Sequence, residues 1–265
     1  FPFVVGSEAA GIVRAVGSGV NHLKVGDSVL TSVGCIRLAN TSARSAIRVP
    51  DGIDLQVAAS FRNNYQTALD GLTRARLQPG EVLLVHGAAG GVGLAAIDIG
   101  LQIGARVIGV VSNDAKKAIV ARYGAEVILR DGAGFRSQIL DLVEGGADVI
   151  FDPVGGDTFD ESVRCVAPFG RILVVGFTSG RPGLAKTHHL LVKDVTVIGF
   201  TVGGLSKVYP EVANNQLMTL MRWLAVGRIK PFISFVPPIS DIQEAYQLIV
   251  DRQSAGKVVI DFAEA

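Results

Sequence analysis

The stretch that most constrains the fold of this chain is VLLVHGAAGGVGLAAI, at residues 82–97. Its first four apolar residues predict a buried strand, and the apolar run after the glycines predicts a helix that begins near Gly91. Gly87, Gly90 and Gly93 follow one another at every third position in between. A Gly-rich turn between a strand and a helix is typical of the first βαβ unit of a dinucleotide-binding fold. A turn that binds no ligand is the alternative, and the strand and helix around it favour the dinucleotide.

The rest of the chain repeats the same alternation of short apolar runs and helical patterns. Strands are predicted at EVLLVHG, ARVIGVVS, AEVIL, ADVIFD, GRILVVGF and DVTVIGF. This order predicts the α/β class with a doubly wound parallel sheet, at residues 67–201. Short strand-like pieces dominate residues 1–66, and strands and helices follow again in residues 202–265. Two terminal pieces that flank one α/β unit predict a second domain built from both chain ends.

Composition narrows the functional classes. Apolar residues make up 49% of the chain and charged residues 18%, which suits strands that are buried on both faces. The net charge of +1 argues against a nucleic-acid or membrane-surface partner. Two cysteines, Cys35 and Cys165, argue against a disulfide framework and suit a reducing compartment. With no run of about 18 apolar residues and no basic segment before FPFVVGSEAAG, the sequence predicts a soluble, cytoplasmic protein.

The Gly-rich turn supplies the first cofactor-binding residues. Compared with the usual dinucleotide fingerprint, Ala88 takes the place of the first glycine, Gly90 of the second and Gly93 of the third. The N–H groups at the start of the helix, at Gly91 and Val92, are expected to meet the pyrophosphate.

The end of the second strand, VVSNDAKK, indicates which dinucleotide is bound. No carboxylate stands there to accept a hydrogen bond from the adenine ribose 2′-OH. Ser112 and Lys116 suit a 2′-phosphate, so the sequence favours NADPH over NADH. Two observations keep the alternative open: Lys116 and Lys117 are also compatible with a solvated helix face, and Asp114 lies nearby.

Motifs along nearly the whole chain resemble those of one family. They are PFVVGSEAAGIV, GVNHLKVGDSV, NYQTAL, LQPGEVLLVHGAAGGVGLAAI, FDPVGGD, GRILVVGF and GKVVI. In this order they resemble the zinc-independent, zeta-crystallin-like quinone oxidoreductases of the medium-chain dehydrogenase/reductase superfamily. The resemblance implies a GroES-like catalytic domain that is split around the Rossmann domain, and a homodimer formed through the Rossmann domain. It also implies NADPH-dependent transfer of hydride to a small-molecule quinone or activated alkene.

The resemblance also suggests residues near the nicotinamide and the substrate. Asn64 and Tyr65 become the candidate catalytic residues, and Thr67 becomes a candidate cofactor contact. The alternative is an ordinary helix N-terminus here, with Asn63 or Asn64 as its cap.

Further cofactor contacts are implied after later strands. Asp152 in FDPVGGD, and Gly176 and Phe177 in VVGF, follow predicted strands at the edge where ligands bind. Phe200 is expected to line the same pocket, with core packing as its alternative. Lys257 matches a family position near the end of the chain, with the capping of a strand as its alternative.

A zinc ion is not expected. The zinc-dependent branch of the superfamily carries Gly-His-Glu where this chain has Gly6, Ser7 and Glu8, and a serine cannot replace an imidazole ligand. The two cysteines are too few for a four-cysteine structural site. The pair His188–His189 is expected in a loop, at the surface or in the core, and not at a metal.

Other functions stay open at this point. One is reduction of an enone, alkenal or enoyl thioester, and another is NADPH binding by a sensor or structural protein with little catalysis. The family pattern also has residues ahead of PFVVGSEAAG and a longer run near Cys35–Ile36. We therefore expect that the natural molecule has residues that this sequence lacks.

Overall fold

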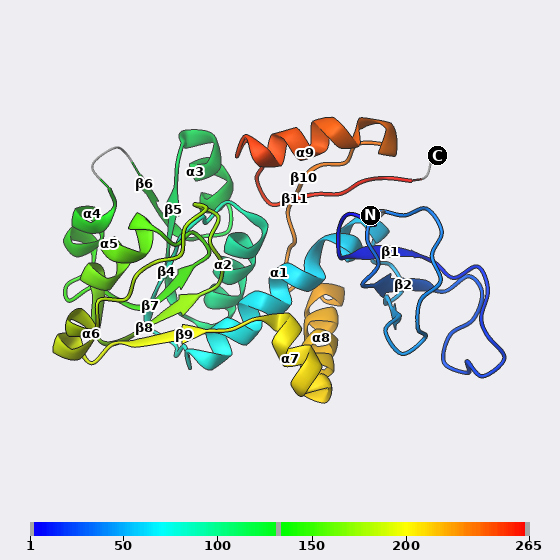
Figure 1. Cartoon of the computed structure of the whole chain (residues 1–265), viewed down its shortest axis with the longest axis horizontal. Helices are drawn as coiled ribbons and strands as arrows, with labels where there is room; N and C mark the ends of the chain where they lie inside the picture. Colours follow the sequence, from blue (N-terminus) through cyan, green and yellow to red (C-terminus); the bar gives the residue numbers. More distant parts are fainter. Residues whose placement is uncertain (1–2, 131–133, 263–265) are drawn as a thin grey trace. The chain divides into compact units, whose positions relative to one another are not determined.

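A computed structural model describes residues 3–130 and 134–262 of the chain (Figure 1). Contacts between Cα atoms divide it into two compact units. The first unit takes residues up to 63 together with residues from 217 onward, and the second unit takes residues 64–216. The predicted domain boundaries lie at 66/67 and 201/202. Residues 202–216 join the second unit, where Gln66 Nε2 donates to the carbonyl of Ala213 at 2.8 Å.

The second unit contains a six-stranded, fully parallel sheet in the order β6-β5-β4-β7-β8-β9. Its strands are β4 (Val82–Val85), β5 (Arg106–Val111), β6 (Glu126–Leu129), β7 (Ala147–Asp152), β8 (Val166–Val174) and β9 (Thr196–Gly199). The order reverses direction on either side of β4, as in a doubly wound Rossmann sheet. The predicted α/β fold class is confirmed, with every predicted strand of the sheet present.

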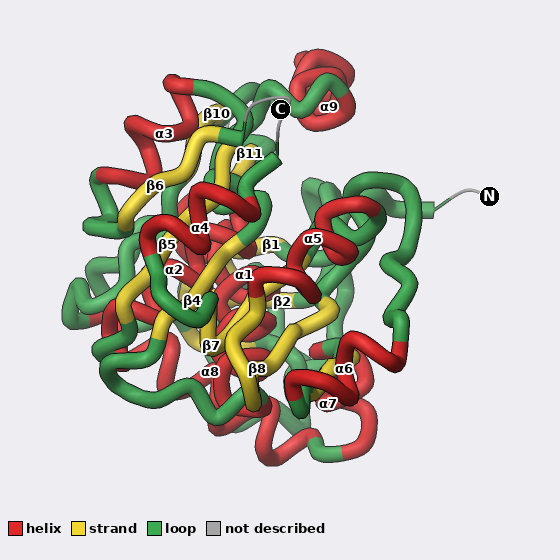
Figure 2. The backbone as a smooth tube through the Cα atoms, turned by 90° about the vertical axis from the view of Figure 1, so that its left-hand side faces the viewer, coloured by secondary structure: helices red, strands yellow, loops and turns green. Residues whose placement is uncertain are grey.

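Helices follow the strands of this sheet along the chain (Figure 2). They are α2 (Gly91–Ile103), α3 (Asp114–Ala121), α4 (Arg136–Leu142), α5 (Asp157–Cys165), α6 (Thr187–Lys193) and α7 (Val202–Val208). Local signals explain their ends: Gly104 closes α2 in the left-handed region, at φ 93°, and the Asn113 side chain caps the first turn of α3. The expected loop at His188–His189 is wrong, because both residues lie in α6.

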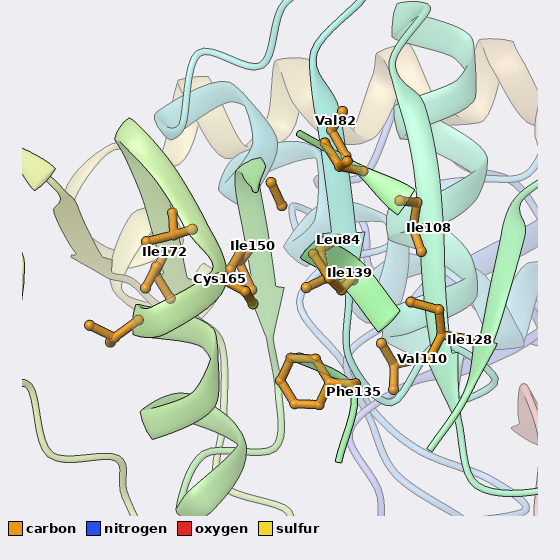
Figure 3. Close-up of a cluster of buried hydrophobic side chains, with 14 of the residues drawn as sticks. Val82, Leu84, Ile108, Val110, Ile128, Phe135, Ile139, Ile150, Cys165 and Ile172 are labelled. Carbon is orange, nitrogen blue, oxygen red and sulfur yellow. The ribbon is translucent and has the colours of Figure 1, made fainter. Parts of the chain in front are cut away.

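Side chains pack both faces of the sheet. On one face α2 approaches so closely that a Cβ at Gly100 would lie 2.6 Å from Leu83 Cδ2. On the other face Leu84 and Ile108 are fully buried in a cluster with Ile139 of α4 (Figure 3). Each such side chain contributes about 1.5–3 kcal/mol through burial. Apolar residues on both faces of β4 explain why its sequence is a continuous apolar run.

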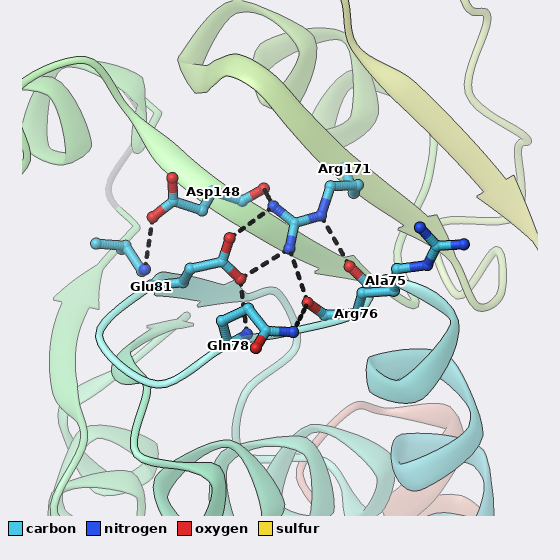
Figure 4. Close-up of polar contacts among 7 residues, drawn as sticks. Ala75, Arg76, Gln78, Glu81, Asp148 and Arg171 are labelled. Carbon is cyan, nitrogen blue, oxygen red and sulfur yellow. Dashed lines mark hydrogen bonds and ion pairs between the residues drawn. The ribbon is translucent and has the colours of Figure 1, made fainter.

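An ion-pair cluster holds the amino edge of the sheet (Figure 4). Arg171 of β8 donates to both carboxylate oxygens of Glu81, at 2.9 and 2.7 Å, and to the carbonyl of Ala75 at 2.8 Å. The backbone N–H of Val82 donates to Asp148 at 2.7 Å. Partial burial by itself would raise the pKa of Glu81, but the Arg171 guanidinium holds that pKa below its ordinary value. These hydrogen bonds hold the first residues of the strands in place, and they involve no residue at the opposite, carboxyl edge of the sheet.

The first unit is mostly β. Its antiparallel sheet has the order β1-β2-β3, and a parallel pair joins β10 to β11. The elements are β1 (Ala9–Ile12), β2 (Ser28–Thr31), β3 (Ile47–Arg48), β10 (Ile233–Phe235), the 3-10 helix η1 (Ile239–Asp241), α9 (Ile242–Val250) and β11 (Lys257–Val258). Leu23, Val29 and Ala46 form a small buried core beneath the sheet. Both chain ends contribute to this unit, as predicted.

Two helices run from one unit into the other along the chain, α1 (Leu55–Arg74) and α8 (Pro210–Ala225). The side chain of Asp54 caps α1, because its Oδ1 accepts the N–H groups of Gln56 and Val57 at 2.8 and 3.2 Å. The alternative that Asn63 or Asn64 caps a helix is therefore wrong. Both asparagines lie in the middle of a helix that begins at Leu55.

Candidate functional site: the Gly-rich turn and the carboxyl edge

The Gly-rich turn lies between β4 and α2, as predicted, but its sharpest residue is not the expected one. Gly87 has a φ of +56°, a conformation that side chains disfavour. Ala88 is fully buried, and its N–H donates to the carbonyl of Val110 at 3.2 Å. The prediction that Ala88 replaces the first glycine is therefore corrected: Gly87 makes the turn, while Ala88 packs into the core with its N–H already bonded.

Gly90 and Gly93 each meet a separate geometric demand. A Cβ at Gly93 would overlap the carbonyl oxygen of Gly87 and lie 2.9 Å from the Cα of Ala88, so only glycine lets the helix pack this close to the turn. Gly90 is the exposed N-cap of α2 and offers no side-chain cap. The N–H groups of the first helical turn, at Gly91, Val92 and Gly93, have no acceptor within the helix. A bare helix N-terminus of this form fits an anionic group such as a pyrophosphate.

Asn64 lies beside this turn. A Cβ at Gly91 would come within 2.5 Å of Asn64 Nδ2, so the absence of a side chain at Gly91 makes room for the Asn64 amide. Thr67 follows three residues later on α1 and is partly exposed. Residues three apart on a helix share a face. The structure therefore brings the Asn64 amide to the Gly-rich turn.

Tyr65 does not present its hydroxyl to a ligand. It is 2% exposed, and its Oη donates to Asp98 Oδ2 of α2 at 2.8 Å. The prediction of a catalytic Tyr65 is corrected: the side chain joins α1 to α2 in the interior. The signal that sequence reasoning missed is Asp98, a carboxylate inside an otherwise apolar helix, which needs a buried donor.

The end of β5 carries the residues predicted to select the dinucleotide. Ser112 is exposed directly after the strand, and Lys116 is partly exposed in the first turn of α3. Asn113 is occupied, because its Oδ1 accepts the N–H of Lys116 at 2.9 Å. The exposed group at the strand end is thus a hydroxyl and not a carboxylate.

Asp152, at the end of β7, shapes a loop. It is 1% exposed, and its Oδ1 accepts the N–H groups of Val154 and Gly155 at 2.8 and 2.9 Å. Burial raises the pKa of Asp152, although these N–H groups oppose the rise. Asp152 therefore acts as an internal brace for the loop after β7. Its carboxyl group does not project from the protein.

The loop after β8 lies along the loop after β7. The N–H groups of Thr178 and Ser179 donate to the carbonyls of Pro153 and Val154, each at 3.0 Å. Phe177 is 48% exposed, and its ring carbon Cδ1 lies 3.0 Å from where Gly155 would carry a Cβ. Gly176 precedes it in the same loop. An exposed aromatic face thus stands at the carboxyl edge of the sheet, where ligands of such folds bind.

His86, which sequence reasoning did not single out, anchors the base of the Gly-rich turn. Ser162 Oγ donates to the carbonyl of Thr158 at 2.7 Å, so the 2.8 Å contact between His86 Nε2 and Ser162 Oγ is a bond donated by the imidazole. Burial, and then the positive charge of Arg130, lower the pKa of His86 to about 3. Among the described residues Nδ1 has no partner. The neutral imidazole therefore joins the end of β4 to α5 by its hydrogen bond to Ser162.

Two predicted cofactor contacts, Phe200 and Lys257, have protein partners of their own. Phe200 packs on α1, since a Cβ at Gly71 would lie 2.6 Å from its Cζ, and the Arg74 guanidinium stands 5.8 Å from its ring centre. The packing alternative is thus the one that the structure supports. Lys257 belongs to the first unit, where its Nζ bonds to Glu8 Oε2 at 2.9 Å.

Metal ligands and membrane spans were also sought. Within residues 3–130 and 134–262, no three side chains of His, Cys, Asp or Glu gather closely enough to hold a metal ion. No helix in the same part of the chain has the length and hydropathy needed to cross a membrane.

Comparison with known proteins identifies the family. Residues 1–48 match the alcohol dehydrogenase GroES-like domain, and residues 91–218 match the domain described as zinc-binding dehydrogenase. A quinone oxidoreductase-like protein 2 homolog of Nematostella vectensis is 36% identical over 273 residues, which cover 98% of this chain and 73% of that protein. This chain belongs to the quinone oxidoreductase-like family of the medium-chain dehydrogenase/reductase superfamily. The resemblance drawn from the motifs is confirmed, and so is the GroES-like identity of the N-terminal β region.

Solved structures of this superfamily agree with the fold. The Escherichia coli quinone oxidoreductase, crystallised as a complex with NADPH, matches with a TM-score of 0.87 at 29% identity, over 96% of this chain and 81% of that one. The CurK enoyl reductase matches with a TM-score of 0.86 at 26% identity, over 97% and 79% of the two chains. The chain is therefore an oxidoreductase of the medium-chain dehydrogenase/reductase superfamily, and the matched structures include a quinone oxidoreductase and an enoyl reductase.

Proposed function

We propose that this protein is an NADPH-dependent, zinc-independent oxidoreductase that reduces a quinone. The observation that carries the proposal is the turn from Gly87 to Gly93, where a side chain at Gly93 would overlap the backbone and the bare N-terminus of α2 fits a pyrophosphate. The E. coli quinone oxidoreductase, with the same fold, was crystallised with NADPH.

Several residues have roles in this proposal. The N–H groups of Gly91, Val92 and Gly93 bind the pyrophosphate, and the Asn64 amide beside them orients the neighbouring part of the cofactor. Phe177 offers its exposed face to the nicotinamide end. When bound, NADPH supplies the hydride. The protein holds the acceptor in place and excludes water.

Ser112 and Lys116 are proposed to select NADPH. A hydroxyl and an ammonium group at the end of β5 favour a 2′-phosphate, and a carboxylate that would favour the 2′-OH of NADH is absent from the strand end. Zinc independence rests on Ser7, whose Oγ accepts a hydrogen bond from Asn63 Nδ2 at 2.9 Å where the zinc branch has a histidine. Without a metal, a conjugated acceptor is the favoured substrate, because the charge spreads onto a distant oxygen.

The acceptor has a second candidate. Similarity to the CurK enoyl reductase favours an enone or an enoyl thioester in place of a quinone. Both reactions use the same hydride donor, so the site residues named above serve either one.

Assembly and location belong to the same proposal. The sheet of the second unit ends at β9, which pairs with β8 on one side. An open edge of this kind can join a second copy, which supports a homodimer through the Rossmann sheet. Light scattering after size-exclusion chromatography tests the homodimer, and a monomer at working concentration would refute it.

A cytoplasmic location is proposed from the free cysteines Cys35 and Cys165.

The decisive experiment follows the absorbance of NADPH with 1,4-benzoquinone, with a simple enone and without acceptor, and repeats the series with NADH. We expect rapid loss of NADPH with the quinone and slower loss of NADH. Faster loss of NADPH with the enone than with the quinone would favour the enone or enoyl-thioester reductase. No loss with any acceptor, despite measurable NADPH binding, would favour the sensor or structural role.

A further inference from the structure

A second contact accompanies the hydrogen bond between Tyr65 and Asp98. Asn64, which precedes Tyr65 on α1, lies beside Gly91 at the start of α2. Gly91 and Asp98 are seven residues apart. Seven residues make close to two turns of an α-helix, so Gly91 and Asp98 share one face of α2. Two adjacent residues of α1 therefore meet the same face of α2, and Asn64 meets it at the first turn.

The bond between Tyr65 and Asp98 is strong for its length and place. Both side chains are buried, and Tyr65 Oη donates to Asp98 Oδ2 at 2.8 Å. A hydrogen bond from a hydroxyl to a carboxylate is stronger than a bond between two neutral groups. Separating the two groups in the interior would take a donor from a buried carboxylate, which is costly. The bond therefore fixes the distance between this turn of α1 and α2.

The helix α2 is the fixed partner in this interface. A Cβ at Gly93 would overlap the backbone of the Gly-rich turn, and a Cβ at Gly100 would lie 2.6 Å from Leu83 Cδ2 of the sheet. Backbone that is packed this closely cannot shift without displacing its neighbours. Asp98 lies between these two glycines and is held with them. Its bond therefore sets the position of Tyr65, and of this turn of α1, relative to α2.

The Asn64 amide has a narrow range of places in which it can lie. Its Nδ2 comes so near to Gly91 that a Cβ there would be only 2.5 Å away. A small shift of α1 toward α2 brings the amide against the backbone, and a small shift away withdraws it from the first turn. Because adjacent residues of a helix move together, the bond made by Tyr65 sets where the Asn64 amide lies.

We propose that Tyr65 and Asp98 are positioning residues, whose hydrogen bond holds the Asn64 amide beside the first turn of α2, where the amide orients the cofactor. Because both side chains are buried, they act through Asn64 and do not touch the cofactor. This inference rests on the proposed function, since the Asn64 amide has a cofactor to orient only if the Gly-rich turn binds a dinucleotide.

Gln66 supplies a matched comparison for the alternative, a bond that only stabilises the fold. It follows Tyr65 on α1 and is equally buried, and its Nε2 donates to the carbonyl of Ala213 of α8 at 2.8 Å. Gln66→Met therefore removes a buried hydrogen bond of the same length from the same turn, on the side that faces α8. A bond that only stabilises gives Tyr65→Phe and Gln66→Met the same phenotype, whereas a positioning bond distinguishes them.

The first test measures the Kd of NADPH by fluorescence titration in the wild type, Asn64→Ala, Tyr65→Phe and the double variant Asn64→Ala/Tyr65→Phe. Loss of one hydrogen bond to the cofactor raises the Kd about fivefold. We expect about a fivefold rise in each single variant. The double variant should again show about a fivefold rise and not the product, about 25-fold, because both changes remove the same amide contact.

Two further variants complete the titration. Gln66→Met should keep the Kd of the wild type. Asp98→Asn retains an oxygen that accepts the Tyr65 hydroxyl, so its Kd should stay close to that of the wild type, whereas Asp98→Leu should match Tyr65→Phe. Urea unfolding of each variant verifies that the titrations compare folded proteins.

Three results would overturn the inference. The first is an unchanged Kd of NADPH in Tyr65→Phe. The second is a Kd in the double variant that is raised by the product of the two single effects, because independent residues add their free energies. The third is a Kd in Gln66→Met that is raised as much as in Tyr65→Phe, because that result would assign both bonds to stability alone.

Nuclear magnetic resonance without NADPH separates this inference from the proposed function. The nuclear Overhauser effect between the Asn64 side-chain amide protons and the Gly91 Hα protons should be strong in the wild type and in Gln66→Met, and weak in Tyr65→Phe. This pattern in a protein that binds no NADPH would uphold the hold of the bond on Asn64 and refute the proposed cofactor. An equally strong effect in Tyr65→Phe would refute the positioning role even if NADPH is bound and consumed.

Discussion

The buried imidazole of His86 predicts a specific loss of stability in acid. In the folded chain the pKa of His86 is about 3, because burial and then Arg130 disfavour the charged ring, whereas the ordinary value is 6.5. Below pH 6.5 the unfolded chain binds a proton that the folded chain does not, so the free energy of unfolding falls as the pH falls. The stability associated with a neutral His86 is fully present above pH 6.5 and is lost progressively as the pH falls to about 3.

The size of the effect follows from the two pKa values. One pH unit corresponds to about 1.4 kcal/mol. At pH 5, one and a half units below 6.5, His86 therefore reduces the free energy of unfolding by about 2 kcal/mol relative to pH 7.5. Solvent screening does not reduce this free-energy difference, because His86 is only 1% exposed.

The test compares the wild type with His86→Gln by urea unfolding between pH 4.5 and 7.5. Gln does not titrate, and its amide reaches Ser162 from nearly the position of the imidazole Nε2. His86→Gln should therefore lose less stability in acid than the wild type, with a difference of about 2 kcal/mol at pH 5. His22→Gln, which removes an exposed imidazole, serves as the matched control. Parallel pH curves for the wild type and His86→Gln would refute the reasoning.

Three further outcomes are expected. Arg171→Met should lower the free energy of unfolding by about 2–3 kcal/mol in urea, because Glu81 loses the two hydrogen bonds that Arg171 donates and keeps only the one from the Gln78 N–H. NADPH affinity should stay unchanged, and a cofactor defect of similar size would contradict the structural role. Gly93→Ala should cost about 1–3 kcal/mol and weaken NADPH binding, because its Cβ meets backbone atoms. Gly203→Ala, in open space on α7, should raise the free energy of unfolding by up to about 1 kcal/mol and leave NADPH binding unchanged, as thermal and fluorescence titrations would show. Ser112→Asp should shift the ratio of kcat/KM from NADPH toward NADH, and a retained NADPH preference would show that selection lies elsewhere.

Short, continuous apolar runs predicted the sheet, because its strands are buried on both faces. Val82 to Val85 form a continuous apolar run, and no tertiary information is needed to recognise such a strand. The start of the helix α1 was harder to predict, since its cap, Asp54, stands ten residues before Asn64, the residue that the motif drew attention to. Local pattern therefore predicts buried strands better than a mixed, partly polar helix.

The details of the site depended on contacts between distant residues. Tyr65 donates a hydrogen bond to the buried carboxylate of Asp98, 33 residues later in the chain. His86 forms a hydrogen bond with Ser162, 76 residues away. The glycine spacing indicated the turn, but assigning the positive φ to Gly87 and not to its neighbour Ala88 required backbone geometry. Residue type thus predicted that a cofactor turn exists, while the partner of each polar side chain needed the fold.

The ends of the parallel strands differ in a way that bears on how this protein can change. At the amino edge, Arg171 and Glu81 lock the strands with side-chain charges, far along each strand from the glycine turn. At the carboxyl edge, backbone N–H groups and carbonyls define the loops, as in the bonds from Thr178 and Ser179. Loop substitutions that alter ligand preference leave the ion-pair lock intact. New specificities can therefore accumulate at one end of the sheet while the other end preserves the folded state.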